Sequence, residues 1–300
     1  MTQNWVGRFA PTPSGPLHFG SLVAALGSYL IARQRNGKWL MRIEDLDPPR
    51  EMPGAAKDIL NTLEAFGFEW DDQVVYQSQK LSTYEKALAL LESKSLVYHC
   101  DCSRKIVMER NDGVYDKYCR NRDLVDFGES AARIKFDTSF AIFNDEIIGK
   151  CEFTQQVFCQ DFVIRRRDGL FAYQLAVVVD DIEAGVNHVV RGADILDSTP
   201  RQNYLYHCLG KKPPQYFHLP LVIDENGHKY SKSKLFPAVK AHQACDWLQQ
   251  AYFHLGQSPA IDFDFTEPKD FLSWAIKNFR VDKISRKPIA YQTGHTGKLI

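Results

Sequence analysis

Short apolar stretches alternate with amphipathic stretches along the first part of the chain. Residues 4–9 predict a strand, and residues 20–35 predict a helix because their apolar side chains recur at helical spacing. A strand of the buried type is expected over 39–43, and a second amphipathic helix over 53–66. This β-α-β-α order predicts an α/β fold in which helices pack on a parallel sheet.

Residues 98–160 interrupt this alternation with short charged stretches and mixed strand signals, and they contain most of the cysteines. We therefore interpret them as an insertion. The elements expected beyond it are strands at 162–164, 188–190 and 218–223, an apolar segment over 171–179, a helix start at 198–200, a turn at 225–227 and helices across 238–280.

These patterns divide the chain at the points where the alternation stops and restarts. Residues 1–97 and 161–228 are expected to form the two halves of one α/β domain, with the inserted subdomain at 98–160 between them. Residues 229–300 are expected to form a loop followed by a short helical subdomain.

The composition is that of an ordinary soluble globular protein, with 44% hydrophobic and 25% charged residues. No apolar run approaches the roughly 18 residues of a membrane span, and the N-terminus lacks the layout of a signal peptide. Basic and acidic residues both number 37, which argues against indiscriminate nucleic-acid binding but allows a local basic patch. The seven unevenly spaced cysteines argue against a disulfide framework. We expect a cytoplasmic monomer that does not associate with membranes.

Residues 7–21 form a turn rich in glycine and proline that leads into the first expected helix. The unpaired amides and the dipole of a helix N-terminus favour anions, and Gly20 lets the backbone approach a ligand closely. His18 would donate to a phosphate oxygen as negative charge develops during attack at an α-phosphorus. Taken alone, His18-Phe19-Gly20 has the simpler interpretation of a tightly packed strand-to-helix turn.

A second segment, Lys229-Tyr230-Ser231-Lys232-Ser233, would place two ammonium groups on the migrating phosphates of a nucleotide. Phosphoryl and nucleotidyl transfers are catalysed mainly by positioning and charge stabilisation, so lysines suffice. The alternative is a solvated basic hairpin tip. The two segments together predict an ATP site without a covalent nucleophile. Its expected residues are His18, Gly20, Ser21, Ser231 and Lys232 for binding, and His18, Gly20, Lys229 and Lys232 for catalysis.

Several side chains elsewhere in the chain suit an amino-acid substrate. Arg8 and Arg191 are candidate carboxylate clamps, because the planar guanidinium matches a carboxylate in bidentate fashion. Glu44 would accept a hydrogen bond from an α-ammonium, and Tyr173 would add a hydroxyl contact. The alternative for residues 42–45 is an ion-pair cluster on the surface, where such pairs contribute little.

Three cysteines have a spacing that suits zinc: Cys100-Asp101-Cys102 and, further along, Cys119. A second close pair of cysteines is absent, so the fourth ligand would be His99, Tyr115, a histidine elsewhere or water. The alternative is a set of buried free thiols.

The run Arg8–Gly20 closely resembles the "HIGH" segment of class I aminoacyl-tRNA synthetases of the glutamyl branch, with Phe19 and Ser21 in place of Ile and His. Residues 229–233 resemble the "KMSKS" loop of the same class, with Tyr230 in place of Met. The glutamate-contacting segments of that branch also have counterparts here. They are 9–12, 42–45, Tyr173 and 190–192.

This resemblance implies a class I synthetase fold, with a Rossmann-type parallel sheet, an inserted zinc-containing subdomain that binds the acceptor and a short C-terminal helical subdomain. It also implies ATP with Mg²⁺, and a pocket for L-glutamate in which the role of each arginine stays open. The residues implied for that pocket are Arg8, Phe9, Ala10, Pro11, Thr12, Glu44, Tyr173 and Arg191. An unpaired buried charge is costly, so such a pocket should reject glutamine.

The pattern Cys-x-Cys…Tyr-x-x-x-Cys resembles the zinc knuckle of a shortened synthetase paralogue. The resemblance implies one structural zinc held by Cys100, Cys102, Tyr115 and Cys119.

Residues 234–300 are too few for an anticodon-binding domain of usual size together with the helical element that connects it. Essentially the whole chain resembles the family of shortened paralogues. The family activates glutamate with ATP, without tRNA, and transfers it to the queuosine base in the anticodon loop of tRNA(Asp). The alternatives are a minimal glutamyl-tRNA synthetase that charges tRNA 3′ ends, a tRNA-binding remnant without activity, and a small-molecule nucleotidylyltransferase.

Overall fold

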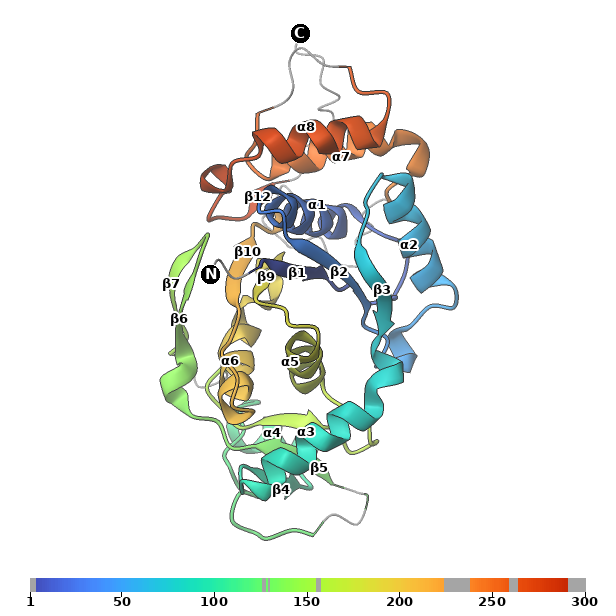
Figure 1. Ribbon diagram of the computed structural model, residues 1–300. Helices are drawn as coiled ribbons and strands as arrows, with labels where there is room; N and C mark the ends of the chain where they lie inside the picture. Colours follow the sequence, from blue (N-terminus) through green and yellow to red (C-terminus); the bar gives the residue numbers. More distant parts are fainter. Residues whose placement is uncertain are drawn as a thin grey trace.

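The computed structural model describes residues 4–125, 128, 130–154, 158–223, 238–258 and 264–290. Within these residues, helices lie on both faces of a parallel sheet, and an antiparallel sheet lies at the end far from the C-terminal helices (Figure 1).

The parallel sheet is built from two groups of strands. In the first group β1 (Val6–Phe9), β2 (Lys38–Ile43) and β3 (Asp71–Tyr76) pair in that order, and in the second β9 (His188–Gly192) pairs with β10 (Gln215–Leu219). The Asn187 N–H donates to the Val6 carbonyl over 3.0 Å, which brings β9 to the edge of β1 that faces away from β2. The strand order therefore reverses between β1 and β9. In open parallel sheets ligands bind at this point, beyond the carboxyl ends of the strands.

Alternation along the strands sorts the side chains between the two faces of the sheet. Phe9, Trp39 and Met41 are buried in the main core under α1 (Phe19–Gln34). Arg8 and Arg42 stand on the opposite face, toward α5 (Tyr173–Glu183). The sheet therefore has one apolar face and one face on which buried charges gather.

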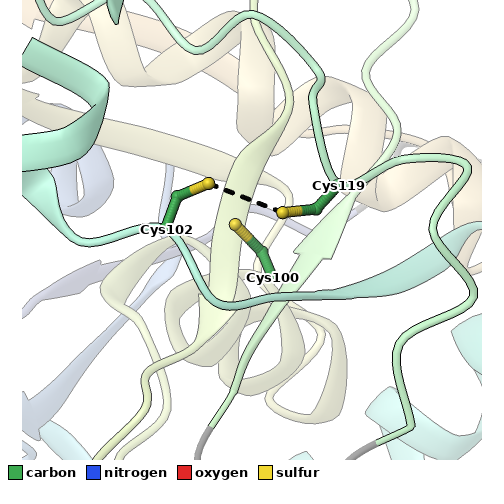
Figure 2. A group of neighbouring side chains, drawn as sticks. All are labelled: Cys100, Cys102 and Cys119. Atoms are coloured by element: carbon green, nitrogen blue, oxygen red, sulfur yellow. Dashed lines mark hydrogen bonds between the residues drawn. The ribbon is translucent and has the colours of Figure 1, made fainter. Parts of the chain in front are cut away.

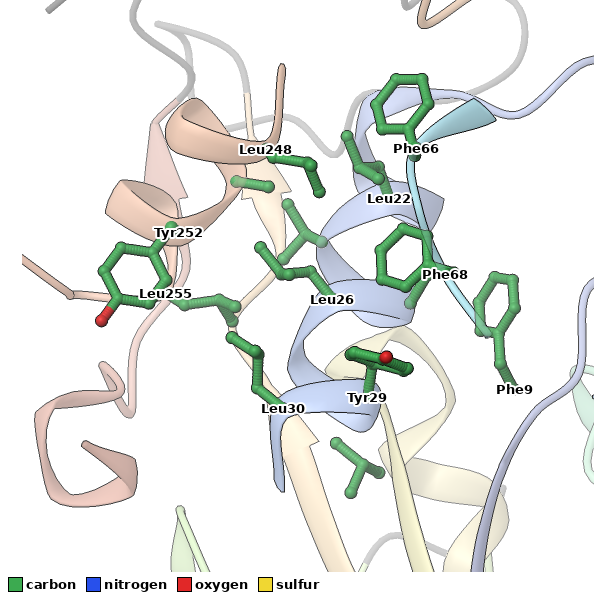
Figure 3. Packing of buried hydrophobic residues seen from close by; sticks show 14 of the residues in the cluster. Phe9, Leu22, Leu26, Tyr29, Leu30, Phe66, Phe68, Leu248, Tyr252 and Leu255 are labelled. Carbon is green, nitrogen blue, oxygen red and sulfur yellow. The ribbon is translucent and has the colours of Figure 1, made fainter. Parts of the chain in front are cut away.

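The main core joins α1 to the C-terminal helices. Leu22, Leu26 and Leu30 of α1 pack against residues of α7 (Ala244–His254), such as Leu248 and Tyr252 (Figure 3). The other helices around this core are α2 (Ala55–Ala65) and α8 (Pro268–Asn278).

The antiparallel sheet has the order β4-β5-β8, and a separate hairpin lies beside β10 (Figure 1). Its strands are β4 (Val97–Cys100), β5 (Ala131–Ile134) and β8 (Phe162–Arg165), and the hairpin is β6 (Ile142–Asp145) with β7 (Gly149–Glu152). The remaining elements are α3 (Leu81–Ser93), α4 (Arg104–Asn111), α6 (Thr199–Cys208), β11 (Val222–Ile223), β12 (Ile289–Ala290) and the 3₁₀ turns Pro48–Arg50, Gln77–Lys80, Thr138–Ala141, Ala193–Ser198, Ala241–Gln243 and Val281–Lys283.

Most of the predicted elements are confirmed within one to three residues. The expected helices at 20–35 and 53–66 are α1 and α2, the strand at 188–190 is β9, and α6 begins at Thr199 with a proline in its first turn. The strand predicted over 218–223 is instead divided into β10 and β11 at Pro220, which has no N–H to donate to a ladder. The turn expected at 225–227 lies outside the described residues.

The strand predicted at 162–164 exists, but the prediction that it resumes the parallel alternation is wrong. It is β8, and it pairs antiparallel with β5 of the predicted insertion. A run of three apolar residues does not reveal the direction of its partner strand, so this pairing could not be predicted from the sequence. The division of the chain at residues 97, 160 and 228 stays a prediction.

Candidate active site

A buried cluster of charged side chains fills the space between the parallel sheet and α5. The Arg8 Nε donates to both carboxylate oxygens of Asp181, over 3.2 and 3.3 Å, and Arg42 donates to Asp181 Oδ1 over 2.6 Å. All three side chains are at most 5% exposed. Burial acts to raise the pKa of Asp181, but the two guanidinium groups hold it below its ordinary value. Asp181 therefore stays ionised and balances two cations.

The neighbouring carboxylate, Asp180, continues this cluster toward α3. It accepts hydrogen bonds from Gln77 over 2.7 Å and from the Tyr84 hydroxyl over 2.9 Å, and Arg42 Nε lies 3.7 Å away. Burial raises the pKa of Asp180, in spite of the nearby Arg42. The two consecutive aspartates thus bind different partners on the sheet and on α3.

Glu44 follows β2 and lies at the carboxyl end of the sheet. Its Oε1 accepts from Arg42 over 3.2 Å, and its side chain is 10% exposed. Burial raises the pKa of Glu44, and the opposing effects of Arg42 and Arg8 do not cancel that increase. The interpretation of residues 42–45 as a surface ion-pair cluster is wrong for Arg42 and Glu44.

Tyr173 begins α5, at the end of the helix opposite Asp181. Burial raises the pKa of its hydroxyl, the negative charge of Glu44 adds to this increase, and the positive charges of Arg191 and Arg8 oppose it. These mutual effects place Tyr173 among the charged residues predicted for the amino-acid pocket.

Arg191, near the end of β9, is held in a different way from Arg8. Its Nε donates to His218 Nε2 over 3.0 Å, one Nη donates to Gln202 Oε1 over 2.7 Å, and the other donates to Thr199 Oγ1 over 2.8 Å. Arg191 is 5% exposed, and within the described residues no carboxylate lies within ion-pair distance of it. A buried cation whose partners are neutral is costly. The arrangement therefore suits an anionic ligand.

A hydrogen bond connects the Arg191 partners with the start of α5. Gln202 donates to Gln174 Oε1 over 3.0 Å, and Gln174 follows Tyr173 directly. The structure therefore brings Arg8, Glu44, Tyr173 and Arg191 to one end of the sheet.

The other predicted pocket residues belong to the segment that follows β1. The Phe9 side chain packs on Trp39, on the face of the sheet away from Arg8. Ala10 is partly exposed, Pro11 is buried and Thr12 is exposed. Glu44 N–H donates to the Pro11 carbonyl over 3.0 Å, so the backbone of this segment lies beside Glu44.

The turn that leads into α1 ends at His18, next to the first residue of the helix. His18 caps the helix, with its Nδ1 accepting from the Ser21 N–H over 3.2 Å and its Nε2 lying 3.0 Å from the Ser21 hydroxyl. A Cβ on Gly20 would lie 3.3 Å from the His18 ring, so glycine permits the imidazole to pack close to the backbone.

The second predicted ATP segment, with Lys229, Ser231 and Lys232, lies outside the described residues. The chain is described again from Ala238, which forms a bridge with His18, and the Val239 N–H donates to the Leu17 carbonyl over 3.0 Å. Residues 238 and 239, which follow the second segment, therefore contact the backbone of the first segment.

The three predicted zinc cysteines lie together at the end of β4 (Figure 2). Their sulfur atoms are all within 4.8 Å of one another. The Tyr115 hydroxyl accepts from the Cys119 N–H over 3.1 Å and hydrogen-bonds to the Cys100 thiol. His99 is the neighbour of Cys100 on β4 and therefore faces the other side, where its Nδ1 lies 3.1 Å from the Ser130 hydroxyl. The three thiols could hold a metal ion, and the Tyr115 hydroxyl lies beside them.

Sequence reasoning missed several residues of this site. Asp181, His218, Gln202 and Thr199 contact the arginines, and Asp145 contacts His218. The consecutive aspartates at the end of the apolar stretch 171–179 were a signal for Asp181, because charge at that position needs a partner. No local signal marked the others.

Residues 5–256 match the family model described as tRNA synthetases class I (E and Q), catalytic domain. A glutamate-tRNA synthetase from Elizabethkingia anophelis superposes with a TM-score of 0.79 at 24% identity, over 97% of this chain and 68% of that one. The fold is thus that of a class I synthetase catalytic domain. Within the described residues, no helix is long and apolar enough to cross a membrane.

The glutamyl-Q tRNA(Asp) synthetase of Ectopseudomonas mendocina (strain ymp) is 51% identical over 95% of this chain and 97% of its own length. The enzyme of the same name from Vibrio cholerae serotype O1 is 45% identical over 94% of this chain and 92% of its own. The chain belongs to the glutamyl-Q tRNA(Asp) synthetase family, within the aminoacyl-tRNA synthetase type of ligases.

Asp181→Asn tests the charge balance of the cluster. We expect it to lower the free energy of unfolding by about 3–5 kcal/mol, because Arg8 and Arg42 lose their shared buried anion. Urea denaturation measures this loss. The matched control is Asp72→Asn, whose partner Lys38 is solvent-exposed and whose loss should change little. Equal stability of the two variants would contradict the assignment.

Proposed function

We propose that this protein activates L-glutamate with ATP, without tRNA, and transfers the glutamyl group to the queuosine base in the anticodon loop of tRNA(Asp). The observation that carries the proposal is Arg191, a buried cation whose described partners are neutral, at the same end of the sheet as Glu44. Glutamate has the complementary groups, namely carboxylates for an arginine and an α-ammonium for a carboxylate.

In the proposed complex, Arg191 binds one carboxylate of glutamate and Glu44 accepts from its ammonium. Tyr173 adds a hydroxyl contact beside both. Arg8 is already paired with Asp181, so its Nη groups would contact the substrate while its Nε keeps the ion pair. Glutamine lacks the side-chain carboxylate, so the arginine that binds that group would be left without an anion, which supports a preference for glutamate.

ATP is assigned to the turn before α1. The α1 N-terminus favours phosphate, and His18 would donate to an α-phosphate oxygen as charge builds up there. Lys229 and Lys232 are assigned to the leaving phosphates from the motif alone, with Mg²⁺ as the companion of ATP. Attack of a glutamate carboxylate oxygen on the α-phosphorus forms glutamyl-adenylate and releases pyrophosphate.

The cysteine cluster fits one zinc ion, held by Cys100, Cys102, Cys119 and Tyr115. With four protein ligands no coordination position is open, so the ion would stabilise the fold around it and take no part in the chemistry.

The proposed acceptor rests on the names of the relatives. These names specify tRNA(Asp) and glutamyl-Q, and the relatives match this chain over nearly their full length. A vicinal diol on queuosine would replace the terminal ribose diol that an ordinary synthetase esterifies.

An acceptor assay tests this function. We expect glutamate-dependent ATP–pyrophosphate exchange without tRNA, and transfer of labelled glutamate to tRNA(Asp) that contains queuosine. The matched control is the same tRNA(Asp) without queuosine, which should take no label. Labelling of the 3′ end of tRNA(Glu) would favour a minimal glutamyl-tRNA synthetase, and ATP consumption without an amino acid would favour a nucleotidylyltransferase.

The raised pKa of Glu44 predicts a pH dependence. Only the ionised carboxylate can accept from the substrate ammonium, so the KM for glutamate should rise as the pH falls, beginning at a higher pH than an ordinary glutamate side chain would give. Exchange kinetics between about pH 5.5 and 8, where free glutamate keeps its charges, measure this rise in the KM. Glu44→Gln should raise the KM for glutamate at every pH and remove its dependence on pH. Glu183→Gln, which alters an exposed side chain, should leave both the KM and its pH dependence unchanged.

Elemental analysis tests the metal. Chelator-washed protein should retain about one zinc per chain, because four protein ligands bind it tightly. Cys102→Ser should lose the zinc, whereas Cys208→Ser, which alters a buried cysteine outside the cluster, should keep it. Wild-type protein without zinc would leave the three cysteines as packed thiols.

A further inference from the structure

A buried chain of hydrogen bonds reaches Arg191 from the β6–β7 hairpin. Asp145 Oδ2, at the end of β6, lies 2.6 Å from His218 Nδ1, and His218 Nε2 lies 3.0 Å from Arg191 Nε. The side chains of Asp145 and His218 are fully buried. None of the sequence motifs includes Asp145 or His218.

The chemistry of the three groups determines which nitrogen of His218 carries the proton. A guanidinium has only donors, so His218 Nε2 must accept from Arg191. The proton of the neutral ring is then on Nδ1, and it is donated to Asp145. Burial lowers the pKa of His218 to about 4, although the hydrogen bond to Asp145 opposes this effect. The imidazole is therefore neutral at physiological pH.

The Asp145 carboxylate is itself held in place. Its Oδ1 accepts from the backbone N–H groups of Ile147 and Ile148, each over 2.9 Å, and its Oδ2 accepts from the His218 N–H over 3.1 Å. The Glu146 N–H donates to the Tyr216 carbonyl over 2.9 Å, which joins the hairpin to β10. Asp145 thus has one orientation, and it keeps three backbone donors even if the imidazole is removed.

The neutral ring separates a carboxylate from the arginine. A carboxylate in direct contact with Arg191 would orient it equally well, but it would compete with a substrate carboxylate for the same cation. Through His218, Asp145 fixes the ring and its tautomer, while the acceptors that the guanidinium contacts within the described residues are all neutral.

We propose that His218 and Asp145 are positioning residues for substrate recognition, which hold Arg191 oriented toward a carboxylate of the amino acid without neutralising its charge. This inference rests on the proposed function. Neither residue touches the substrate, so their effect is specific to amino-acid binding and leaves ATP binding unchanged.

Three variants test the inference, with the KM for glutamate and the KM for ATP measured in the exchange assay. His218→Leu removes the acceptor of Arg191 Nε and should raise the KM for glutamate at least about tenfold, the size expected for a hydrogen bond to a charged group. The KM for ATP should change less than about twofold. Asp145→Asn, which can favour the wrong tautomer, should raise the KM for glutamate severalfold. In His218→Gln an amide oxygen near the position of Nε2 should restore much of the affinity.

The matched control is His188→Leu, which removes an imidazole at the opposite end of β9 from Arg191. It should leave both KM values unchanged. Equilibrium binding of glutamate, followed by calorimetry, should rank the proteins in the same order as the KM values. If His218→Leu fails to fold, Asp145→Asn and His218→Gln still give this ranking.

The outcomes separate the two levels of the proposal. Unchanged glutamate KM values in folded His218→Leu and Asp145→Asn, beside an active wild type, would overturn the positioning role alone. Equal losses for glutamate and ATP, or the same loss in His188→Leu, would also overturn it, because they indicate general destabilisation. A wild type that shows no exchange with glutamate would overturn the proposed function and, with it, this inference.

Discussion

The pairing of one buried carboxylate with two arginines shapes the whole site. Strand alternation places Arg8 and Arg42 on the same face of the parallel sheet, and each charge would be costly to bury alone. Asp181 balances both, and because it lies on α5 it also fixes how that helix crosses the sheet. Tyr173, at the other end of the same rigid helix, is thereby placed beside Glu44. An interaction that stabilises the fold thus also positions a residue of the pocket.

The arginines consequently differ in their surroundings, although the sequence analysis names both Arg8 and Arg191 as candidate carboxylate clamps. Arg8 and Arg42 are paired with carboxylates of the protein, so much of their charge is balanced before any substrate arrives. Within the described residues Arg191 has a histidine, a glutamine and a threonine as side-chain hydrogen-bond partners, and none of these balances its charge. Under the proposed function, this difference in partners, rather than the number of arginines, would give selectivity for an acidic amino acid.

The parts of the molecule that could be predicted are those with a local signal. Helical spacing located α1 and α2. The motifs gave His18, Glu44 and Arg191 as candidate site residues, and their roles stay predictions. The direction of β8 could not be predicted, because its three apolar residues pair equally well in either direction and its partner, β5, lies within the predicted insertion. His218 and Asp145 were missed for a related reason. Their contact joins residues that are distant in the sequence, and an isolated histidine in a strand usually has no role beyond packing.

The insertion and the parallel sheet are joined by the contacts that hold Arg191. Asp161, next to β8, accepts from Tyr98 over 2.8 Å and from Arg120 over 2.6 Å, which ties the cysteine cluster to the antiparallel sheet. The predicted insertion also contains the β6–β7 hairpin. Asp145 of this hairpin begins the chain of hydrogen bonds that reaches Arg191 through His218. The β6–β7 hairpin is therefore connected to Arg191 through buried hydrogen bonds.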